Sequence, residues 1–298
     1  MASNKATPDW AVGEKIASPT GNSYRVIGEP KPGGFGIAYL VKDDTGLECI
    51  LKVPRTDAAA TGGKDGLKIR IDSMETESKV LADLDPVANV PRRLAFFETK
   101  IEGVKVPILV MERAKGILLE KYLNTHVNSP SMTTEAIVSY VTKLCHTMSE
   151  IHSNDLIHRD LKSPNLFIEP HPTDPGLTII DFGIAARVAT STLWSEATIQ
   201  GSLYRAQSKF YAPPEQGSGT ESLKVDVFAV GAVATELFTW RVKPSMPRGH
   251  TYSPNEVIPT LANINPIPED IDKVIQRATM HDRTMRFATM KEFAMDLN

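Results

Sequence analysis

The first third of the chain carries short apolar runs separated by Gly and Asp. The runs lie between Tyr24 and about Val110 and include residues 37–41, 50–53 and 106–110. Such runs are typical of strands, and their short connections favour an antiparallel sheet. Residues 73–84 interrupt them with the periodicity of one helix, and the Gly-rich stretch 58–66 is predicted to be a loop.

The rest of the chain, after about Gly116, is predicted to be mainly helical. One helical face carries Ile137, Tyr140, Val141, Leu144, Met148 and Ile151. Residues 225–238 are apolar almost all round, which indicates a helix buried within a larger unit. A second single stripe near the end of the chain consists of Ile271, Val274, Ile275 and Ala278.

These patterns predict an α+β fold with two lobes, a small antiparallel β-sheet lobe with one helix and a larger, mainly helical lobe. A chain of 298 residues is long enough for this arrangement. We expect one domain over residues 1–298, with an N-terminal tail (1–20), a first lobe (21–112) and a second lobe (113–298). The connection between the lobes is expected near residues 111–116.

Composition narrows the class of protein without defining its function. Apolar residues make up 41% of the chain and charged residues 23%, which is ordinary for a soluble globular protein. The net charge of −3 gives no reason to expect binding to nucleic acid or to an anionic membrane. The two cysteines, Cys49 and Cys145, favour a reducing compartment such as the cytoplasm. We found no apolar stretch long enough to span a membrane.

Two short motifs carry the inventory for phosphoryl transfer. The first is His158-Arg159-Asp160-Leu161-Lys162-Ser163-Pro164-Asn165, and the second is Asp181-Phe182-Gly183. Phosphoryl transfer needs a carboxylate to accept the acceptor hydroxyl's proton, oxygen ligands for Mg²⁺ and a cation for the moving charge. The motifs match the H-R-D-L-K-x-x-N and D-F-G patterns, so the chain resembles the eukaryotic-type (Hanks-type) Ser/Thr protein kinase family.

The resemblance implies a role for each polar residue of these motifs. Asp160 would orient and deprotonate the acceptor hydroxyl, and Lys162 would stabilise the transferring γ-phosphoryl group of ATP. Asn165 and Asp181 would supply the protein's ligands to Mg²⁺, because this ion prefers oxygen donors. A lysine at position 162 resembles the Ser/Thr-specific branch of the family.

Lys52 lies in the apolar strand 50–53, where a lysine could simply face solvent on an edge strand. By resemblance it is the lysine that binds the α- and β-phosphates of ATP, with a helical glutamate as its partner. Glu77 is the better placed glutamate, because Val80 and Leu81 follow at +3 and +4 and can pack while Glu77 faces the nucleotide. Glu75 is the alternative.

Several further residues are expected to contact ATP. The glycine-rich stretch is expected to approach the phosphates; alone it could be an ordinary hairpin, and Lys31 replaces the family's first glycine. Its predicted contacts are Lys31, Gly33, Gly34, Phe35 and Gly36. The resemblance also implies adenine contacts from Ala38, Ile50, Met111, Glu112 and Ala114. Ala38 is smaller and Ile50 larger than the usual residues, which indicates either compensating repacking or weakened ATP binding.

The stretch from Asp181 to Glu215 resembles an activation segment. The resemblance implies that Arg159 pairs with a phosphorylated hydroxyl in this segment, and we predict autophosphorylation within residues 190–202. Ser208 would contact Asp160 and Lys162. Two structural contacts are also implied. Glu215 of the P-P-E segment, Pro213-Pro214-Glu215, would form an ion pair with Arg286. Asp226 of the D-x-x-x-x-G pattern, which ends at Gly231, would cap the backbone of the catalytic loop, residues 158–165.

The sequence as a whole predicts a Ser/Thr protein kinase that uses Mg-ATP and phosphorylates protein substrates, resembling a bacterial-type or minimal kinase domain. One alternative is a nucleotide-binding pseudokinase or scaffold, which would be expected to lack Lys52, Asp160, Asn165 or Asp181. The other alternative is a kinase-like enzyme that acts on a small molecule. The oligomeric state cannot be inferred from the sequence.

Overall fold

The computed structural model describes residues 8–56, 64–101, 103–125, 132–171, 174–188, 210–216, 221–239 and 267–298. The fold is α+β, and the described residues form two compact units. The first unit is drawn from Met1–Pro86, Val90–Ala114 and Phe182–Ile184, and the second from Val87–Asn89, Lys115–Asp181 and Ala185–Asn298. A single boundary after residue 112, as predicted from the sequence, differs from this division at three short segments, residues 87–89, 113–114 and 182–184.

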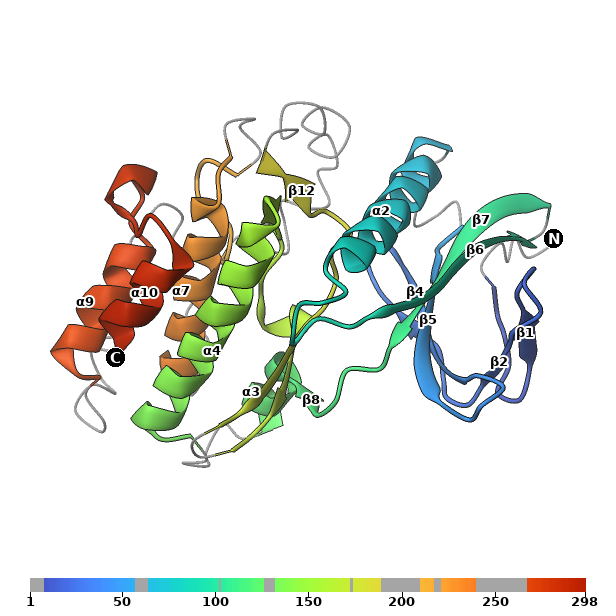
Figure 1. The fold of residues 1–298 in the computed structure, drawn as a ribbon, viewed down its shortest axis with the longest axis horizontal. Helices are drawn as coiled ribbons and strands as arrows, with labels where there is room; N and C mark the ends of the chain where they lie inside the picture. Colours follow the sequence, from blue (N-terminus) through green and yellow to red (C-terminus); the bar gives the residue numbers. More distant parts are fainter. Residues whose placement is uncertain are drawn as a thin grey trace, which may run out of the picture. The chain divides into compact units, whose positions relative to one another are not determined.

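The first unit contains an antiparallel seven-stranded sheet in the order β1-β2-β4-β5-β7-β6, with β3 paired to β4 (Figure 1). The strands are β1 (Lys15–Ala17), β2 (Ser23–Val26), β3 (Lys31–Pro32), β4 (Gly36–Lys42), β5 (Glu48–Pro54), β6 (Arg93–Ile101) and β7 (Val104–Glu112). The predicted runs 37–41, 50–53 and 106–110 all lie within these strands. The antiparallel sheet predicted from the apolar runs is thus confirmed.

Side chains alternate between the two faces of β4 and β5. One face forms the core of the first unit, with Tyr39, Val41, Cys49, Leu51 and Val53 among its buried residues. The partly exposed residues Ala38, Leu40, Ile50 and Lys52 lie on the other face. Lys52 is therefore fixed on a particular face of the sheet by the burial of its neighbours along the strand.

Helix α2 (Lys64–Asp83) packs against β5, β6 and β7 of this sheet. It begins earlier than the predicted start at residue 73, so the prediction of a loop up to residue 66 is wrong for residues 64–66. The missed residues 66–72 show no apolar stripe, because only Arg70 among them is buried and the others are partly or fully exposed.

The predicted N-terminal tail is also wrong over part of its length. Residues 15–17 form β1, which pairs with β2 at the edge of the sheet. The ring of Trp10 packs against Tyr39 with a centroid distance of 5.1 Å, and the Tyr39 hydroxyl donates to the carbonyl of Pro8. Residues 8–17 carry few large apolar side chains, too few for a periodic pattern.

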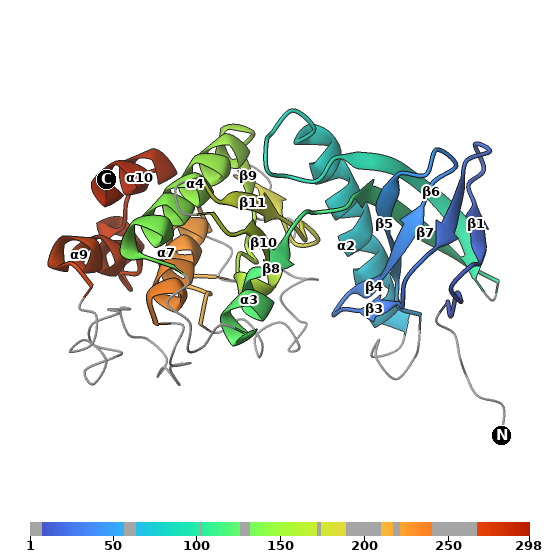
Figure 2. The same ribbon diagram turned by 90° about the horizontal axis from the view of Figure 1, so that it is seen from below.

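The second unit is mainly helical, as predicted (Figure 2). Its described helices are α3 (Leu119–Thr125), α4 (Thr134–Ser153), α7 (Lys224–Thr239), α9 (Glu269–Ala278) and α10 (Met290–Leu297). The predicted faces of α4 and α7 are buried, and α4 packs against both α7 and α10. No helix in the described part of the chain is long and apolar enough to cross a membrane.

Gly231 explains how closely α7 and α9 approach each other. A Cβ atom at this position would lie 2.7 Å from Cγ2 of Thr279 and 2.9 Å from Cβ of Ala278. The glycine of the predicted D-x-x-x-x-G pattern is therefore required by helix packing.

The described part of the second unit also contains two small sheets and two short 3₁₀ helices. One sheet has the order β11 (Gly176–Ile179), β10 (Leu166–Glu169), β8 (Ile117–Leu118), and the other pairs β12 (Ala186–Arg187) with β9 (Leu156–Ile157). The 3₁₀ helices are Ser163–Asn165 and Arg283–Met285. Gly116, just before β8, has φ +82°, and a Cβ there would overlap the carbonyl of Ile168.

Candidate active site

In the first unit, the predicted partners Lys52 and Glu77 form an ion pair. The Nζ atom of Lys52 lies 2.5 Å from Oε2 of Glu77, and the side chains are 17% and 2% exposed. Glu77 comes from α2 and Lys52 from β5, so the pair joins the helix to the sheet. Glu77, rather than the alternative Glu75, is therefore the partner of Lys52 in the structure. In such a pair the opposite charges favour each other.

The residues predicted to contact adenine lie near Lys52 in the sheet register. Ala38 is directly opposite Lys52 on β4, and Ile50 precedes Lys52 by two positions on the same face. Ala38 and Ile50 are thus diagonal neighbours, within reach of each other across the strands. This placement is compatible with the predicted compensation between a small and a large side chain.

The glycine-rich stretch forms a tight hairpin between β3 and β4. The N–H of Gly33 donates to the carbonyl of Gly36 at 2.8 Å, and Lys31 pairs with Ala38. A Cβ at Gly36 would lie 2.6 Å from the carbonyl oxygen of Val53, so the close approach of β5 requires this glycine. A Cβ at Gly34 would meet nothing within 4 Å. Packing thus accounts for Gly36 but not for Gly34.

The segment predicted to contact adenine comprises the last residues of β7 and the residues directly after it. Met111 is 6% exposed and pairs with Ile50 in the sheet, whereas Ala114 is half-buried. The side chain of Glu112 accepts from Nε of Arg92 at 2.6 Å, and its backbone N–H donates to the carbonyl of Arg92 at 3.0 Å. The side chain of Glu112 is therefore engaged in an ion pair with Arg92.

In the second unit, three of the predicted catalytic side chains come together. Nζ of Lys162 donates to both carboxylate oxygens of Asp160, at 2.9 and 2.8 Å. Nδ2 of Asn165 donates to the same carboxylate at 3.0 Å and to the Asp160 carbonyl at 2.8 Å. The lysine and the amide hold the carboxylate of Asp160 in one orientation. Charge-assisted hydrogen bonds of this kind are roughly twice as strong as neutral ones.

His158 joins this loop to the end of β11. The backbone N–H of Asp160 donates to Nδ1 of His158 at 3.2 Å, and Nε2 of His158 lies 3.3 Å from the carbonyl of Ile180. This pattern matches the neutral imidazole tautomer with its proton on Nε2, because Nδ1 accepts while Nε2 donates. The imidazole thus orients the backbone that carries Asp160.

Asn165 and Asp181, the predicted Mg²⁺ ligands, lie at one end of the β10–β11 hairpin. Leu166 pairs with Ile179, and the N–H of Ile180 donates to the carbonyl of Asn165 at 2.9 Å. Asn165 and Asp181 therefore extend from neighbouring strand ends. The hydrogen bonds of Asn165 given above use its amide nitrogen. Its carbonyl oxygen and the carboxylate of Asp181 are donors of the kind that Mg²⁺ prefers, so these two residues could hold the ion.

Two residues of this site have backbone conformations that non-glycine residues rarely adopt. Arg159, immediately before the catalytic aspartate, and Asp181 both have φ +68°. Such residues cost of order 1–3 kcal/mol each and persist only where surrounding contacts impose the conformation. They cluster at active sites, and here they flank the predicted catalytic and metal-binding positions.

Asp226, near the start of α7, caps the catalytic loop as predicted. Its carboxylate accepts from the N–H groups of His158 at 2.8 Å and Arg159 at 2.9 Å, and from Nε2 of His152 at 2.9 Å. Burial alone would raise the pKa of Asp226, but its hydrogen bonds, first that from His152 and then that from the backbone of His158, lower the pKa below its ordinary value. Asp226 is thus a fully buried carboxylate whose charge is compensated.

A second acidic residue of α7 binds the far end of the same loop. The carboxylate of Glu236 accepts from Ser163 Oγ at 2.9 Å and from the Tyr211 hydroxyl at 2.6 Å. Burial and the neighbouring Glu236 raise the pKa of Tyr211, so the phenol stays protonated and donates. This contact links the catalytic loop to the P-P-E segment.

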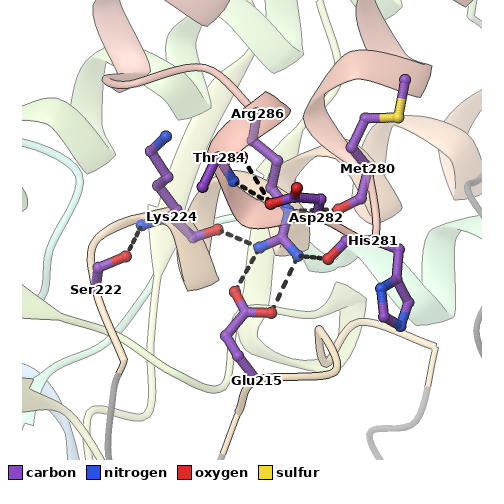
Figure 3. Close-up of polar contacts among 8 residues, drawn as sticks. All are labelled: Glu215, Ser222, Lys224, Met280, His281, Asp282, Thr284 and Arg286. Atoms are coloured by element: carbon purple, nitrogen blue, oxygen red, sulfur yellow. Dashed lines mark hydrogen bonds and ion pairs between the residues drawn. The ribbon is translucent and has the colours of Figure 1, made fainter.

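Glu215 of the P-P-E segment pairs with Arg286 as predicted (Figure 3). The pair is bidentate, with distances of 2.6 Å between Nη1 and Oε1 and 3.1 Å between Nη2 and Oε2. Arg286 also donates to the carbonyls of Met280, Lys224 and His281. All five N–H groups of the guanidinium are therefore used.

Sequence reasoning missed some residues that hold the catalytic loop. Gln216 and Glu221 both contact Arg159, through its carbonyl and its guanidinium, and no sequence pattern marked them. His152, which contacts Asp226, also lies outside the motifs. A usable signal existed for Asp226 and Glu236, because charged residues inside an apolar helix must find partners. The predicted phosphorylation sites within residues 190–202 and Ser208 lie outside the described residues.

Comparisons with known proteins place this site in a family. Residues 22–293 match the family model of the protein kinase domain. The chain belongs to the protein kinase family.

Particular relatives are bacterial. The chain is 27% identical to the serine/threonine-protein kinase PrkC of Bacillus subtilis over 295 residues, which covers 96% of this chain and 41% of PrkC. It is 26% identical to serine/threonine-protein kinase PknB of Mycobacterium tuberculosis over 70% of this chain and 33% of PknB. The chain therefore spans well under half the length of these relatives.

A solved structure agrees with the fold. The kinase domain of PknI from Mycobacterium tuberculosis matches with a TM-score of 0.67 and 21% identity, covering 97% of this chain and 98% of the domain. At this identity the likeness establishes the fold alone.

Proposed function

We propose that this chain is a Ser/Thr protein kinase that transfers the γ-phosphoryl group of Mg-ATP to Ser or Thr hydroxyls of protein substrates. The observation that carries the proposal is the arrangement around Asp160. Lys162 and Asn165 both donate to its carboxylate, within a loop whose backbone is capped by Asp226. A carboxylate held in this way is suited to positioning an acceptor hydroxyl.

The first unit would bind the nucleotide. Lys52, kept charged by Glu77, would contact the α- and β-phosphates. The hairpin residues Lys31, Gly33, Gly34, Phe35 and Gly36 would approach the phosphates. Adenine would contact Ala38, Ile50, Met111 and the backbones of Glu112 and Ala114. The open space beside Gly34 supports this role for the hairpin, because a backbone without side chains can approach phosphates closely.

The second unit would carry the chemistry. Mg-ATP, when bound, supplies the phosphoryl group and the metal charge that neutralises it. Asp160 would hold the acceptor hydroxyl and take its proton, and Lys162 would stabilise the charge on the moving group. Asn165 and Asp181 would hold Mg²⁺ through oxygen atoms.

The two alternative functions have less support. A pseudokinase is disfavoured because Lys52, Asp160, Asn165 and Asp181 are all present and Lys52 is paired with Glu77. A kinase of small molecules is disfavoured by the Glu215–Arg286 pair, which builds the P-P-E segment that the family uses for protein substrates. Autophosphorylation within residues 190–202 and a cytoplasmic location remain part of the proposal. The buried, unbridged Cys49 and Cys145 support a reducing compartment.

The proposal predicts that replacing Asp160 abolishes phosphate transfer. The protein is incubated with Mg-ATP and a mixture of protein substrates, and incorporated phosphate is located by mass spectrometry. We expect Asp160→Ala to lower the rate roughly 10²- to 10⁴-fold, because a positioned proton acceptor is lost. Asp174→Ala, at an exposed aspartate of the same unit, serves as the control and should leave the rate unchanged. Equal rates for wild type and Asp160→Ala would contradict the proposal.

A further inference from the structure

Arg159 is the strained residue of the catalytic loop. Its φ of +68° lies in the left-handed region, and it immediately precedes Asp160. A change in its backbone would rotate the next peptide and move the carboxylate that the proposed reaction uses. The contacts that impose this conformation therefore control the position of Asp160.

Three contacts from residues 216–226 hold Arg159. The carboxylate of Asp226 accepts from its N–H at 2.9 Å. Nε2 of Gln216 donates to its carbonyl at 2.7 Å. Glu221 binds the side chain, with 2.5 Å between Arg159 Nη2 and Glu221 Oε2. The N–H, carbonyl and guanidinium are thus each anchored by a different residue of one short segment.

The ion pair with Glu221 is buried. The side chains of Arg159 and Glu221 are 12% and 6% exposed, and Arg159 Nε has no hydrogen-bond partner in the described part of the chain. A guanidinium at this depth needs an opposite charge close by. The carboxylate of Glu221 supplies that charge, and it comes from the protein itself.

We infer that Glu221 is a positioning residue that holds Arg159, and through it Asp160, in the working geometry without a phosphoryl group on the protein. This inference rests on the proposed kinase function. It differs from the sequence expectation, in which Arg159 pairs with a phosphorylated hydroxyl. In the structure the guanidinium of Arg159 pairs with the carboxylate of Glu221, where the sequence expectation had a phosphoryl group. Phosphorylation of residues 190–202 would therefore not be needed for activity.

Steady-state kinetics test the inference. The protein is treated with phosphatase, and mass spectrometry verifies that it carries no phosphate. Glu221→Gln keeps the shape of the side chain and removes its charge. We expect it to lower kcat roughly ten- to a hundredfold, the size of effect that a small misplacement of a catalytic group produces. KM for ATP should change less than about twofold, because the nucleotide contacts are untouched. Glu221→Asp keeps the charge and should recover part of kcat.

The control is Glu269→Gln, which alters an exposed glutamate paired with Lys273 and should leave kcat unchanged. Unphosphorylated wild type should produce a linear progress curve from the start. A lag that disappears after incubation with Mg-ATP would overturn the inference, as would a wild-type kcat in Glu221→Gln. Wild type that transfers no phosphate in either state would instead contradict the proposed function.

Amide hydrogen exchange gives a second readout that does not require activity. Peptides covering residues 157–165 should exchange faster in Glu221→Gln than in wild type, while peptides from α9 and α10 should not change. A purely structural role would loosen the whole unit and accelerate exchange in all of these peptides. Unchanged exchange in residues 157–165, or uniform acceleration, would overturn the inference. If Glu221→Gln fails to fold, the same comparison is made with Glu221→Asp.

Discussion

Each compact unit pairs a buried glutamate with a cation, and the two pairs are built differently. In the first unit Lys52 reaches Glu77 from a strand, and the lysine side chain keeps 17% of its surface exposed. In the second unit Arg286 is completely buried and makes a bidentate pair with Glu215. Arg286 also donates to three backbone carbonyls, so it ties together segments that are distant in sequence.

We interpret the difference as one between an ion pair proposed to serve phosphoryl transfer and an ion pair that holds the second unit together. A cation that satisfies backbone carbonyls as well as a carboxylate cannot be replaced by an apolar side chain without leaving those carbonyls unpaired. A lysine that keeps part of its surface exposed can be replaced at a smaller loss of stability. We therefore expect the two pairs to respond differently when both partners are made apolar.

The largest effect is expected at the architectural pair. Glu215→Ala leaves the buried charge of Arg286 uncompensated and should lower the free energy of unfolding by about 3–5 kcal/mol. The double variant Glu215→Met/Arg286→Met should not recover this loss, because the carbonyls of Met280, His281 and Lys224 lose their donors. Urea denaturation followed by circular dichroism measures both quantities.

Glu269→Ala is the control for this measurement, since it breaks an exposed pair with Lys273 and should leave the denaturation midpoint unchanged. Recovery of wild-type stability in the double methionine variant would show that Arg286 acts only as the counter-ion of Glu215. The comparison between the two pairs would then fail.

Prediction from sequence succeeded where a residue's role is fixed by a short motif or by periodic burial. The strands around Lys52 and the buried helix α7 follow from such patterns, and the pairing of Glu215 with Arg286 follows from the resemblance to the kinase family. Two predictions, the start of α2 and the tail over residues 15–17, were wrong because their determinants are not periodic. These segments depend on buried polar groups and on pairing with strands elsewhere in the chain.

The residues that hold the catalytic loop show the same limit of prediction from sequence. Asp160, Lys162 and Asn165 are neighbours in sequence, so their convergence could be predicted. Gln216 and Glu221 are distant from Arg159 in sequence, and nothing in their local sequence indicates that they act on it. Only the fold of the second unit brings them to the strained residue.

The second prediction concerns Asp226, which joins architecture to the site. Asp226→Asn removes the charge from three hydrogen bonds and should lower the free energy of unfolding by roughly 2–3 kcal/mol at pH 7. Because the folded pKa of Asp226 is lowered, its contribution is complete above the unfolded pKa of about 3.9 and is lost as the pH falls through the folded value. The gap in stability between the two proteins should therefore narrow below about pH 4.

This narrowing is measured by urea denaturation of both proteins between about pH 3 and pH 7. Asp174→Asn provides the control at an exposed aspartate and should match wild type at pH 7. A constant gap across the range would mean that Asp226 stabilises the unit through shape and not through its charge. The catalytic loop would then be held by packing and not by the charge of Asp226. Charged contacts in the two units could then no longer be compared on this basis.

The smallest loss of stability is expected at the pair that serves chemistry. Lys52→Met leaves Glu77 without its cation and should lower the free energy of unfolding by about 1–2 kcal/mol, between the values for exposed and buried pairs, because Glu77 can take up a proton. Lys52→Met/Glu77→Met should bring stability back to within about 1 kcal/mol of wild type, since a buried pair can be exchanged for apolar side chains of similar volume.

Phosphate transfer should not return in this double variant, because the cation proposed to contact the α- and β-phosphates of ATP is missing. Stability is measured by urea denaturation and transfer by mass spectrometry on the same preparations, so the two readouts can be compared directly. A double variant as unstable as Lys52→Met would make this pair architectural as well. A double variant that transfers phosphate at the wild-type rate would remove Lys52 from the proposed mechanism. Recovery of stability without activity is the outcome that only a pair kept for its chemistry produces.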